Sequence, residues 1–503
     1  MKLYILLICV LFLHAVDAQV DCSLTPERSL DGAVILGNGT PGSVSTAMLQ
    51  NALNTGGVIR FNLGNSPSQI NLTATLTVTK QTVIDGGGLV TLSGKNQHRI
   101  FLLENPQNLS YTFTVQNIAL NNGFTATESG GAIFKPSGGP WQAVSLEVIN
   151  TQFENNNAIQ VEQDGGGGAI YAIGMNQVLI SGSSFIQNSG SNGGALYALG
   201  SDVIRITDSV FDGNVATGNS GNPGNGGNAG AIGVDGAERT INICRTEIIN
   251  NEANAYGVGF FSVMYDQDSL TAFTDVTFEN NVNSQDFGLG GGAYIQGGPF
   301  VINRSSFIEN QSRGAGGLFL GPNANGEIVN STVYGNVASH TLGGGISIDG
   351  TAEVTLRHVT IVNNHAPCEV CFAGGISIGS NNQTTMYNSI LANNTGGNLF
   401  NPWNIFNPIA GSNNLQFPQQ RPNGQTEVQA TAATLWANPL LAAPSHNGGY
   451  TVTMASNPNS PGINQALLMQ STPQDQRSFN RFQTPDYGAY ELQADLIFAD
   501  GFE

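Results

Sequence analysis

The sequence predicts an all-β protein that folds as a single right-handed parallel β-helix, with an N-terminal capping helix and an irregular C-terminal segment. Two observations support this fold class. A sequence motif returns about every 25 to 37 residues between Gly130 and Asn393. Between the Gly- and Asn-rich turns lie apolar runs of three to five residues, too short for helices and typical of strands. Three short strands per repeat leave no room for a crossover helix, so each coil is expected to pair with the next at ~4.8 Å.

Each repeat opens on Gly-Gly-Ala or a similar triplet and closes on an apolar residue followed three positions later by Asn. Nine successive repeats share the closing motif: Phe153/Asn156, Phe185/Asn188, Phe211/Asn214, Ile248/Asn251, Phe278/Asn281, Phe307/Asn310, Val333/Asn336, Ile361/Asn364 and Ile390/Asn393. Stacked coils would place the Phe rings in one internal stack and the Asn side chains in a buried amide ladder. Asn suits such a corner because it tolerates left-handed backbone and its amide can hydrogen-bond a neighbouring turn.

A second column lies three residues before the apolar position of the closing motif. Its members are Asn150, Gly182, Asp208, Arg245, Asp275, Arg304, Asn330, His358 and Tyr387. The alternating charges from Asp208 to Arg304 could be interpreted as a catalytic row. We favour the simpler interpretation of bend residues with ion pairs between coils, because Asn, Gly and Asp are typical of bends.

The ends of the chain define the remaining segments. Residues 1–18 have the basic start, short apolar core and small-residue cleavage site of a secretory signal peptide. An N-terminal lead follows at 19–44, and residues 45–129 hold a capping helix at Ser45–Asn54 and irregular first coils. Regular coils occupy 130–393, irregular coils 394–491 and a short tail 492–503. The signal peptide predicts an extracellular or cell-surface protein with no transmembrane helix in the mature chain.

Composition restricts the partners. Charged residues make up only 10% of the chain and the formal net charge is −19. A negative surface argues against nucleic acid, anionic membranes and polyanionic glycans unless a cation bridges them. We therefore expect a monomer whose partner is an extracellular glycan or other surface ligand.

Four cysteines remain after cleavage of the signal peptide, at positions 22, 244, 368 and 371. Four cysteines allow three disulfide pairings. Cys368 and Cys371 lie in one loop beside His365 and are consistent with either a disulfide or a metal site. A disulfide that fixes the loop is the favoured interpretation in an exported protein.

The loops that follow each closing Asn vary most in length and should emerge on one side of the solenoid, where such proteins bind their partners. Four of these loops carry Asp286, Arg313, His340 and His365. One acid, one guanidinium and two imidazoles could perform acid–base catalysis or bind an acidic sugar. The alternative is that they are ordinary solvated loop residues. No cofactor is required by the sequence, although calcium could bind at Asp266 and Asp268.

Two sets of motifs resemble known families. The Gly-Gly-Ala-Ile and Phe-x-x-Asn repeats are similar to those of chlamydial polymorphic outer-membrane proteins, which are surface adhesins. The stretch HNGGYTVTMASNPNSPGIN through DQRSFNRFQTPDYGAYE resembles the end of the bacterial "choice-of-anchor Q" domain, a right-handed β-helix upstream of surface-sorting tails. Ser478 and Tyr487 replace the usual Gly and Ile of that motif. The fold also resembles the pectate-lyase-like superfamily, but the catalytic patterns of its enzymes are not found in this sequence.

These observations favour a secreted or cell-surface scaffold that binds glycans or surfaces as an adhesin does. The alternative is an extracellular polysaccharide lyase or hydrolase that uses Asp286, Arg313, His340 and His365, or Asp266 and Asp268 with a divalent cation. Fold alone does not decide between them.

Overall fold

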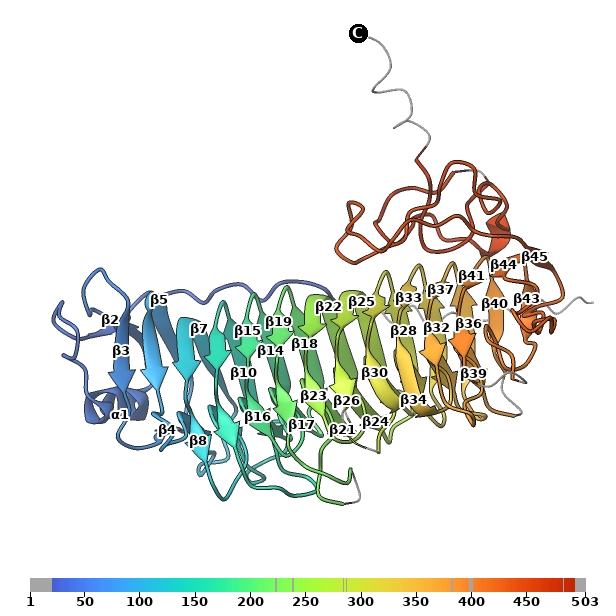
Figure 1. Cartoon of the computed structure of the whole chain (residues 1–503). Coiled ribbons are helices and arrows are strands. Elements are labelled where there is room, and N and C mark those ends of the chain that lie inside the picture. The colour runs from blue at the N-terminus through green and yellow to red at the C-terminus, as the bar shows by residue number, and fades with distance from the viewer. Residues whose placement is uncertain are drawn as a thin grey trace, which may run out of the picture.

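The computed structural model describes residues 20–221, 224–237, 239–283, 285, 287–380, 383–397, 401–482 and 484–493. Residues 1–18, which are predicted to be a signal peptide, and Asp286 lie outside this range. The described chain forms a right-handed parallel β-helix, as predicted, drawn from blue to red along its axis in Figure 1. Each coil contributes strands to three parallel sheets of 24, 10 and 11 strands.

The 24-stranded sheet contains two parallel runs that meet at a bend. The first run contains β1 (Val34–Leu36), β2 (Gly57–Phe61), β5 (Thr82–Ser93), β7 (Tyr111–Asn121), β10 (Val144–Ile149), β14 (Gln177–Ser181), β18 (Val203–Thr207), β22 (Thr240–Ile249), β25 (Leu270–Glu279), β28 (Pro299–Asn303), β32 (Asn325–Val329), β36 (Glu353–Arg357), β40 (Thr385–Tyr387) and β43 (Ala410–Ser412). The long strands β5, β7, β22 and β25 continue through the bend into the second run. That run also contains β3 (Ser68–Asn71), β11 (Gln152–Glu154), β15 (Ser184–Ile186), β19 (Val210–Asp212), β29 (Ser306–Ile308), β33 (Thr332–Tyr334), β37 (Thr360–Val362), β41 (Ile390–Ala392), β44 (Asn414–Phe417) and β45 (Thr434–Trp436).

The two smaller sheets complete each coil. The 10-stranded sheet contains β8 (Phe124–Thr125), β12 (Asn157–Ala158), β16 (Ser189–Gly190), β20 (Val215–Ala216), β23 (Glu252–Ala253), β26 (Val282–Asn283), β30 (Gln311–Gly314), β34 (Val337–Thr341), β38 (His365–Ala366) and β42 (Thr395–Gly396). The 11-stranded sheet contains β4 (Leu76–Val78), β6 (Phe101–Leu103), β9 (Ile133–Lys135), β13 (Ile170–Ile173), β17 (Leu196–Leu199), β21 (Ile232–Gly236), β24 (Phe260–Met264), β27 (Ala293–Gln296), β31 (Leu318–Leu320), β35 (Ile346–Ile348) and β39 (Ile376–Ile378).

A helix covers the N-terminal end of the solenoid, as predicted. It is α1 (Thr46–Thr55), and the hydroxyl of Ser45 caps it by accepting a hydrogen bond from the amide of Met48. Leu49 and Leu53 are fully buried on its inner face. The helix therefore closes the open end of the core, which would otherwise expose apolar side chains and a strand edge.

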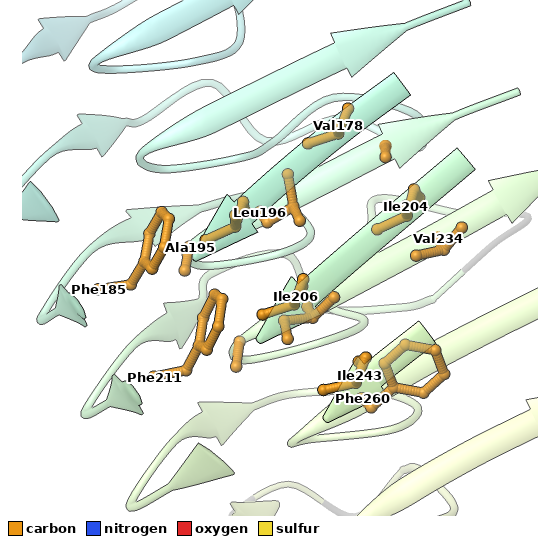
Figure 2. Close-up of a cluster of buried hydrophobic side chains, with 14 of the residues drawn as sticks. Val178, Phe185, Ala195, Leu196, Ile204, Ile206, Phe211, Val234, Ile243 and Phe260 are labelled. Atoms are coloured by element: carbon orange, nitrogen blue, oxygen red, sulfur yellow. The ribbon is translucent and has the colours of Figure 1, made fainter. Parts of the chain in front are cut away.

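The core follows from side-chain alternation along every strand. Figure 2 shows inward Val178 and, on the next coil, Ile204 and Ile206, facing Leu196 and Val234 across the solenoid. The predicted phenylalanine stack is present: the ring centroids of Phe153, Phe185 and Phe211 lie 4.6 and 4.5 Å apart with nearly parallel planes. Equivalent residues therefore repeat at the strand spacing.

Buried asparagines form a continuous hydrogen-bonded row next to the Phe stack. Each side-chain amide donates to the side-chain oxygen of the next member at 2.8 to 3.0 Å. The row is Asn156, Asn188, Asn214, Asn251, Asn281, Asn310, Asn336, Asn364, Asn394 and Asn404.

The prediction of Asn393 as a member of this row was wrong. Leu391, rather than Ile390, pairs with Ile361 in the apolar column, so the residue three positions later is Asn394. Asn393 instead has a left-handed backbone with φ of 55°, as do Asn155, Asn250 and Asn363 one position before their row members. The left-handed conformation therefore occurs at the residue before the row member. The row members themselves are buried asparagines whose side-chain amides form hydrogen bonds between coils.

The column from Asn150 to His358 is a line of bends, as the sequence indicated. Its members have φ values of 45° to 59°, and the last is Asn388 rather than Tyr387. Arg245 pairs with Asp208 at 2.7 Å and Arg304 pairs with Asp275 at 2.8 Å. We call this line of bends the bend edge.

The two chain ends cover the bend edge. The N-terminal lead crosses its first half, with Cys22 bonded to Cys244 and Arg28 paired with Glu147. The C-terminal segment, residues 440–493, covers the second half, where Gln476 accepts a hydrogen bond from Thr332 at 2.7 Å. Figure 1 shows the dark-blue lead and the red C-terminal segment along the same edge.

Buried ion pairs hold the C-terminal segment together, and they come from the motif DQRSFNR…DYGAYE. Arg477 bonds Asp475 at 2.6 Å and lies between the rings of Phe479 and Tyr490. Arg481 pairs with Glu491 at 3.0 Å. A short 3₁₀ turn, η1 (Leu468–Gln470), lies in the same segment. No helix in the described residues is long and apolar enough to cross a membrane.

Candidate functional site

The structure places two of the residues predicted to form a catalytic cluster on neighbouring coils. Arg313 on β30 and His340 on β34 lie in the same irregularity of the pairing, between the pairs Ser312–Ala338 and Gly314–Thr341. On the next coil His365 pairs in register with Val337, three residues before His340, so the backbone positions of the two histidines are offset by roughly 10 Å along the strand direction. His340 is exposed beside Ser339, and His365 contacts the hydroxyl of Thr395 at 2.7 Å. The fourth member, Asp286, is outside the described residues.

Metal and sulfur chemistry were the other predicted features. Within the described ranges, no three His, Cys, Asp or Glu side chains gather as a metal site would require. Cys368 and Cys371 form a disulfide, and Cys22 and Cys244 form another. The first disulfide closes the loop that carries Phe372, whose amide donates to the carbonyl of Leu342 at 3.2 Å.

The outer face of the 11-stranded sheet carries a column of aromatic residues. Strand register aligns Leu102, Phe134, Tyr171, Tyr197, Gly233, Phe261, Tyr294, Phe319, Ser347 and Ser377 on successive coils. The rings of Phe261, Tyr294 and Phe319 stack with centroids 5.3 and 5.0 Å apart. At Gly233 the ring of Tyr197 occupies the space of a side chain, because a Cβ there would lie 2.5 Å from Cδ2 of Tyr197.

The column changes from aromatic rings to hydroxyls after Phe319. Ser347 and Ser377 occupy the next two coils, and Phe406 follows, with its amide bonded to the carbonyl of Ile376 at 3.0 Å. A cavity of about 410 Å³ opens over the two serines. A pair of small side chains between aromatic residues therefore creates the concave site that ligand binding favours.

Aromatic and aliphatic side chains form the walls of this cavity. Phe319 lines one end, and Phe372 and Phe406 line the other with centroids 4.8 Å apart. Leu289 and Leu342 line it from the variable loops. The loop side predicted to bind partners thus contributes three of these walls, through Leu289, Leu342 and Phe372.

Polar groups are few. The hydroxyl of Ser347 accepts a hydrogen bond from the amide of Gly343 at 2.9 Å, and Asp349 accepts from the amide and hydroxyl of Thr351 at 2.9 and 2.8 Å. Of the described residues that line the cavity, Asp349 alone is charged. Burial raises the pKa of nearby Tyr294, whose hydroxyl stays protonated and donates to Gln296. The site can therefore stack flat apolar surfaces and bond a few hydroxyl groups.

Sequence reasoning missed this site, although a signal was present. The residue after the first inward position of each opening motif is aromatic in GGAIF, GGAIY, GGALY and GGLF, and becomes Ser in GGGIS and GGIS. Aligning that outward position would have located the serine pair. The walls contributed by Phe372 and Phe406 come from irregular segments and have no such pattern.

No protein-family model matches the chain, and no curated protein matches its sequence at a significant level. The solved structures that are similar to it include the following two. The periplasmic alginate epimerase AlgG has 11% identity and a TM-score of 0.33, over 81% of this chain and 82% of that one. Tailspike protein 3 of bacteriophage CBA120 has 13% identity and a TM-score of 0.37, over 81% of this chain and 60% of the tailspike. Similarity this distant carries no argument about function.

Proposed function

We propose that the protein is a secreted or cell-surface scaffold that binds an uncharged glycan in the cavity over Ser347 and Ser377. The observation that carries this proposal is the serine pair that opens a cavity between Phe319 on one side and Phe372 and Phe406 on the other. Sugar rings have apolar C–H faces that stack on aromatic rings and hydroxyl groups that bond serine and carboxylate oxygens.

Charge favours a neutral ligand. The lining offers Asp349 and no cationic side chain among its described residues, and the chain carries a net charge of −19. An acidic glycan would enter this site without a charge partner and against a negative surface.

Export and surface location are part of the proposal and come from the sequence. Residues 1–18 have the features of a signal peptide. The resemblance of Leu441–Glu491 to the "choice-of-anchor Q" end supports location at a bacterial surface. The adhesin-like role is a proposal of the same kind.

The alternative of a polysaccharide lyase or hydrolase would use the row of loop residues from Asp286 to His365, or Asp266 and Asp268 with a divalent cation. Of its described loop members, Arg313 and His340 lie on neighbouring strands, and His365 pairs with Val337 on the next coil. The cavity is lined by none of these three residues, so binding is the function that the cavity supports best.

The test is a glycan array followed by calorimetry with the best neutral ligand, using wild type and Ser377→Phe. A ring at this position continues the aromatic column into the cavity, so binding should fall by about tenfold or more. The matched control is Ser184→Phe, which adds the same ring next to inward Phe185 on the second run of the 24-stranded sheet. Equal affinity of wild type and Ser377→Phe would overturn the site, and no binding across the array would overturn the function.

A further inference from the structure

The 11-stranded sheet turns into the 24-stranded sheet along an edge that is rich in glycine. Register and backbone hydrogen bonds align Gly174, Gly200, Gly236, Met264, Gly297, Pro322, Gly350 and Ser380 on successive coils at this turn. We call this line the glycine edge. Five of the eight positions are glycine. Gly236, Pro322, Gly350 and Ser380 are partly or fully exposed, whereas the other four positions are buried.

The cavity opens at one end of the glycine edge. Gly350, Gly379 and Ser380 line it there, next to Asp349. A ligand that leaves the cavity on this side therefore continues over the partly exposed Pro322.

An exposed indole lies at the other end. Trp141 packs over Gly174 and Gly200, since a Cβ at Gly174 would lie 2.6 Å from the indole ring. The glycines support one face of the ring, yet 61% of Trp141 remains exposed. A large aromatic side chain this exposed is typical of a binding surface.

A second exposed ring lies between these two points. Tyr265 follows Met264 on the glycine edge, its amide bonds the carbonyl of Gly236 at 3.1 Å, and 66% of it is exposed. Charges along this part of the edge disfavour a polyanion: Arg239 is paired with Asp202 at 3.0 Å, and Asp266 and Asp268 are exposed on the loop of Tyr265.

The distance between the two ends follows from the register. Five strand spacings separate Gly200 after β17 from Gly350 after β35, through β21, β24, β27 and β31. At ~4.8 Å per coil, the end of the Trp141 platform and the start of the cavity are ~24 Å apart. One or two sugar rings cannot span this distance.

We propose that Trp141 is a distal subsite for the same ligand, so that the protein binds an extended neutral oligosaccharide laid along the glycine edge from the cavity to the indole. This inference rests on the proposed function of the cavity. Tyr265 supplies an intermediate stacking surface, and the partly exposed Pro322 and Gly350 lie between it and the cavity. The ligand class is thereby narrowed from a neutral glycan to a neutral polymer.

The experiment measures affinity against chain length. The probes are neutral β-linked gluco-, manno- and N-acetylgluco-oligosaccharides from dimer to octamer, titrated into the full mature chain. Affinity should rise with length until the oligomer reaches Trp141. Trp141→Ala should weaken the octamer about tenfold and leave the dimer unchanged, the loss expected for one stacking contact.

Two controls keep the outcomes separate. Tyr450→Ala removes an equally exposed ring, at 63%, from the C-terminal segment on the bend edge and should change neither affinity.

Iodide quenching of the Trp141 fluorescence, with Trp141→Phe as the blank, should be reduced by the octamer and not by the dimer. This second readout does not depend on the folding of the alanine variant. Dimer and octamer of equal affinity, or an unprotected indole, would overturn the subsite while leaving the cavity in place; absence of binding at every length would overturn the proposed function itself.

Discussion

A single outward position decides what each coil of this solenoid presents on its 11-stranded sheet. Where the residue is Phe or Tyr, as at Phe319, its ring stacks on its neighbours and closes the surface. Where it is Ser347 or Ser377, the backbone is the same but a cavity opens. Because strand pairing fixes the backbone independently of the outward side chain, this position can change the binding surface without changing the fold.

His358 shows the reverse case, a polar side chain with a structural role. It lies on the bend edge and is completely buried there. Its ring contacts Ser471 and the carbonyl of Gly488 in the C-terminal segment, and Asn388 in the next coil. Burial, followed by the positive charges of Arg481 and Arg357, lowers its pKa well below the usual value. The native state therefore holds a neutral imidazole.

This gives a prediction for acid stability. Below the unfolded-state pKa of about 6.5 the unfolded chain binds a proton that the native His358 does not, so stability should fall by up to about 1.4 kcal/mol per pH unit as pH decreases. The raised pKa values of Asp486 and Glu491 act in the opposite direction, since those native carboxyls retain protons as pH falls. The His358→Gln variant lacks the imidazole and shows how much of this pH dependence comes from His358. Denaturant unfolding at pH 7.5 and 5.0 should show that wild type loses more stability on acidification than the variant does. Equal losses would contradict the role of a buried neutral His358.

At the scale of the element, the buried amide row links successive coils through side-chain hydrogen bonds. Asn310 donates to the side chain of Asn336 at 3.0 Å and to the carbonyl of Phe278 at 2.9 Å, and it accepts from the amide and side chain of Asn281. Each amide thus satisfies polar groups of two neighbouring coils inside an apolar wall.

Replacing one member should therefore be costly. Asn310→Ala leaves several buried donors and acceptors without partners and should lower the free energy of unfolding by about 3 kcal/mol. The adjacent Glu309→Ala is the matched control, because Glu309 is exposed and makes only the left-handed bend, with φ of 52°. Urea unfolding of both variants provides the measurement. Similar midpoints would show that the row contributes little.

The sequence predicted the period, the Phe stack and most of the amide row because each depends on one repeated residue type. It placed the last member at Asn393 because Ile390-Leu391 and Asn393-Asn394 satisfy the spacing in two registers, and only pairing with Ile361 distinguishes them. The cavity was missed for a related reason: its floor is marked by small residues, and its walls at Phe372 and Phe406 come from loops without a period. Contacts between irregular segments depend on the folded path and have no local pattern.

At the scale of the whole molecule, both chain ends stabilise the bend edge. The lead reaches Cys244 through a disulfide that spans 222 residues of sequence and is supported by Arg245, which bonds the carbonyl of Cys22 at 3.0 Å. The lead thereby links the first coils directly to the middle of the solenoid.

Removing that link should lower stability more than removing the other disulfide. The double variant Cys22→Ser/Cys244→Ser should lose about 2–5 kcal/mol, because the closed loop is long. Cys368→Ser/Cys371→Ser opens a loop with a sequence separation of 3 and should cost less. Thermal unfolding of both double variants is the measurement, and the reverse order of melting temperatures would contradict this account.

Because the coils stack at a fixed spacing, the length of the solenoid can change only in steps of one coil. The five strand spacings between Gly200 and Gly350 can change only by whole coils, in steps of ~4.8 Å. Insertion or deletion of one complete repeat between β21 and β31 would preserve both ends of the glycine edge while moving them apart or together. The preferred degree of polymerisation of the bound oligomer should then shift with the number of repeats, so that repeat duplication tunes ligand selection.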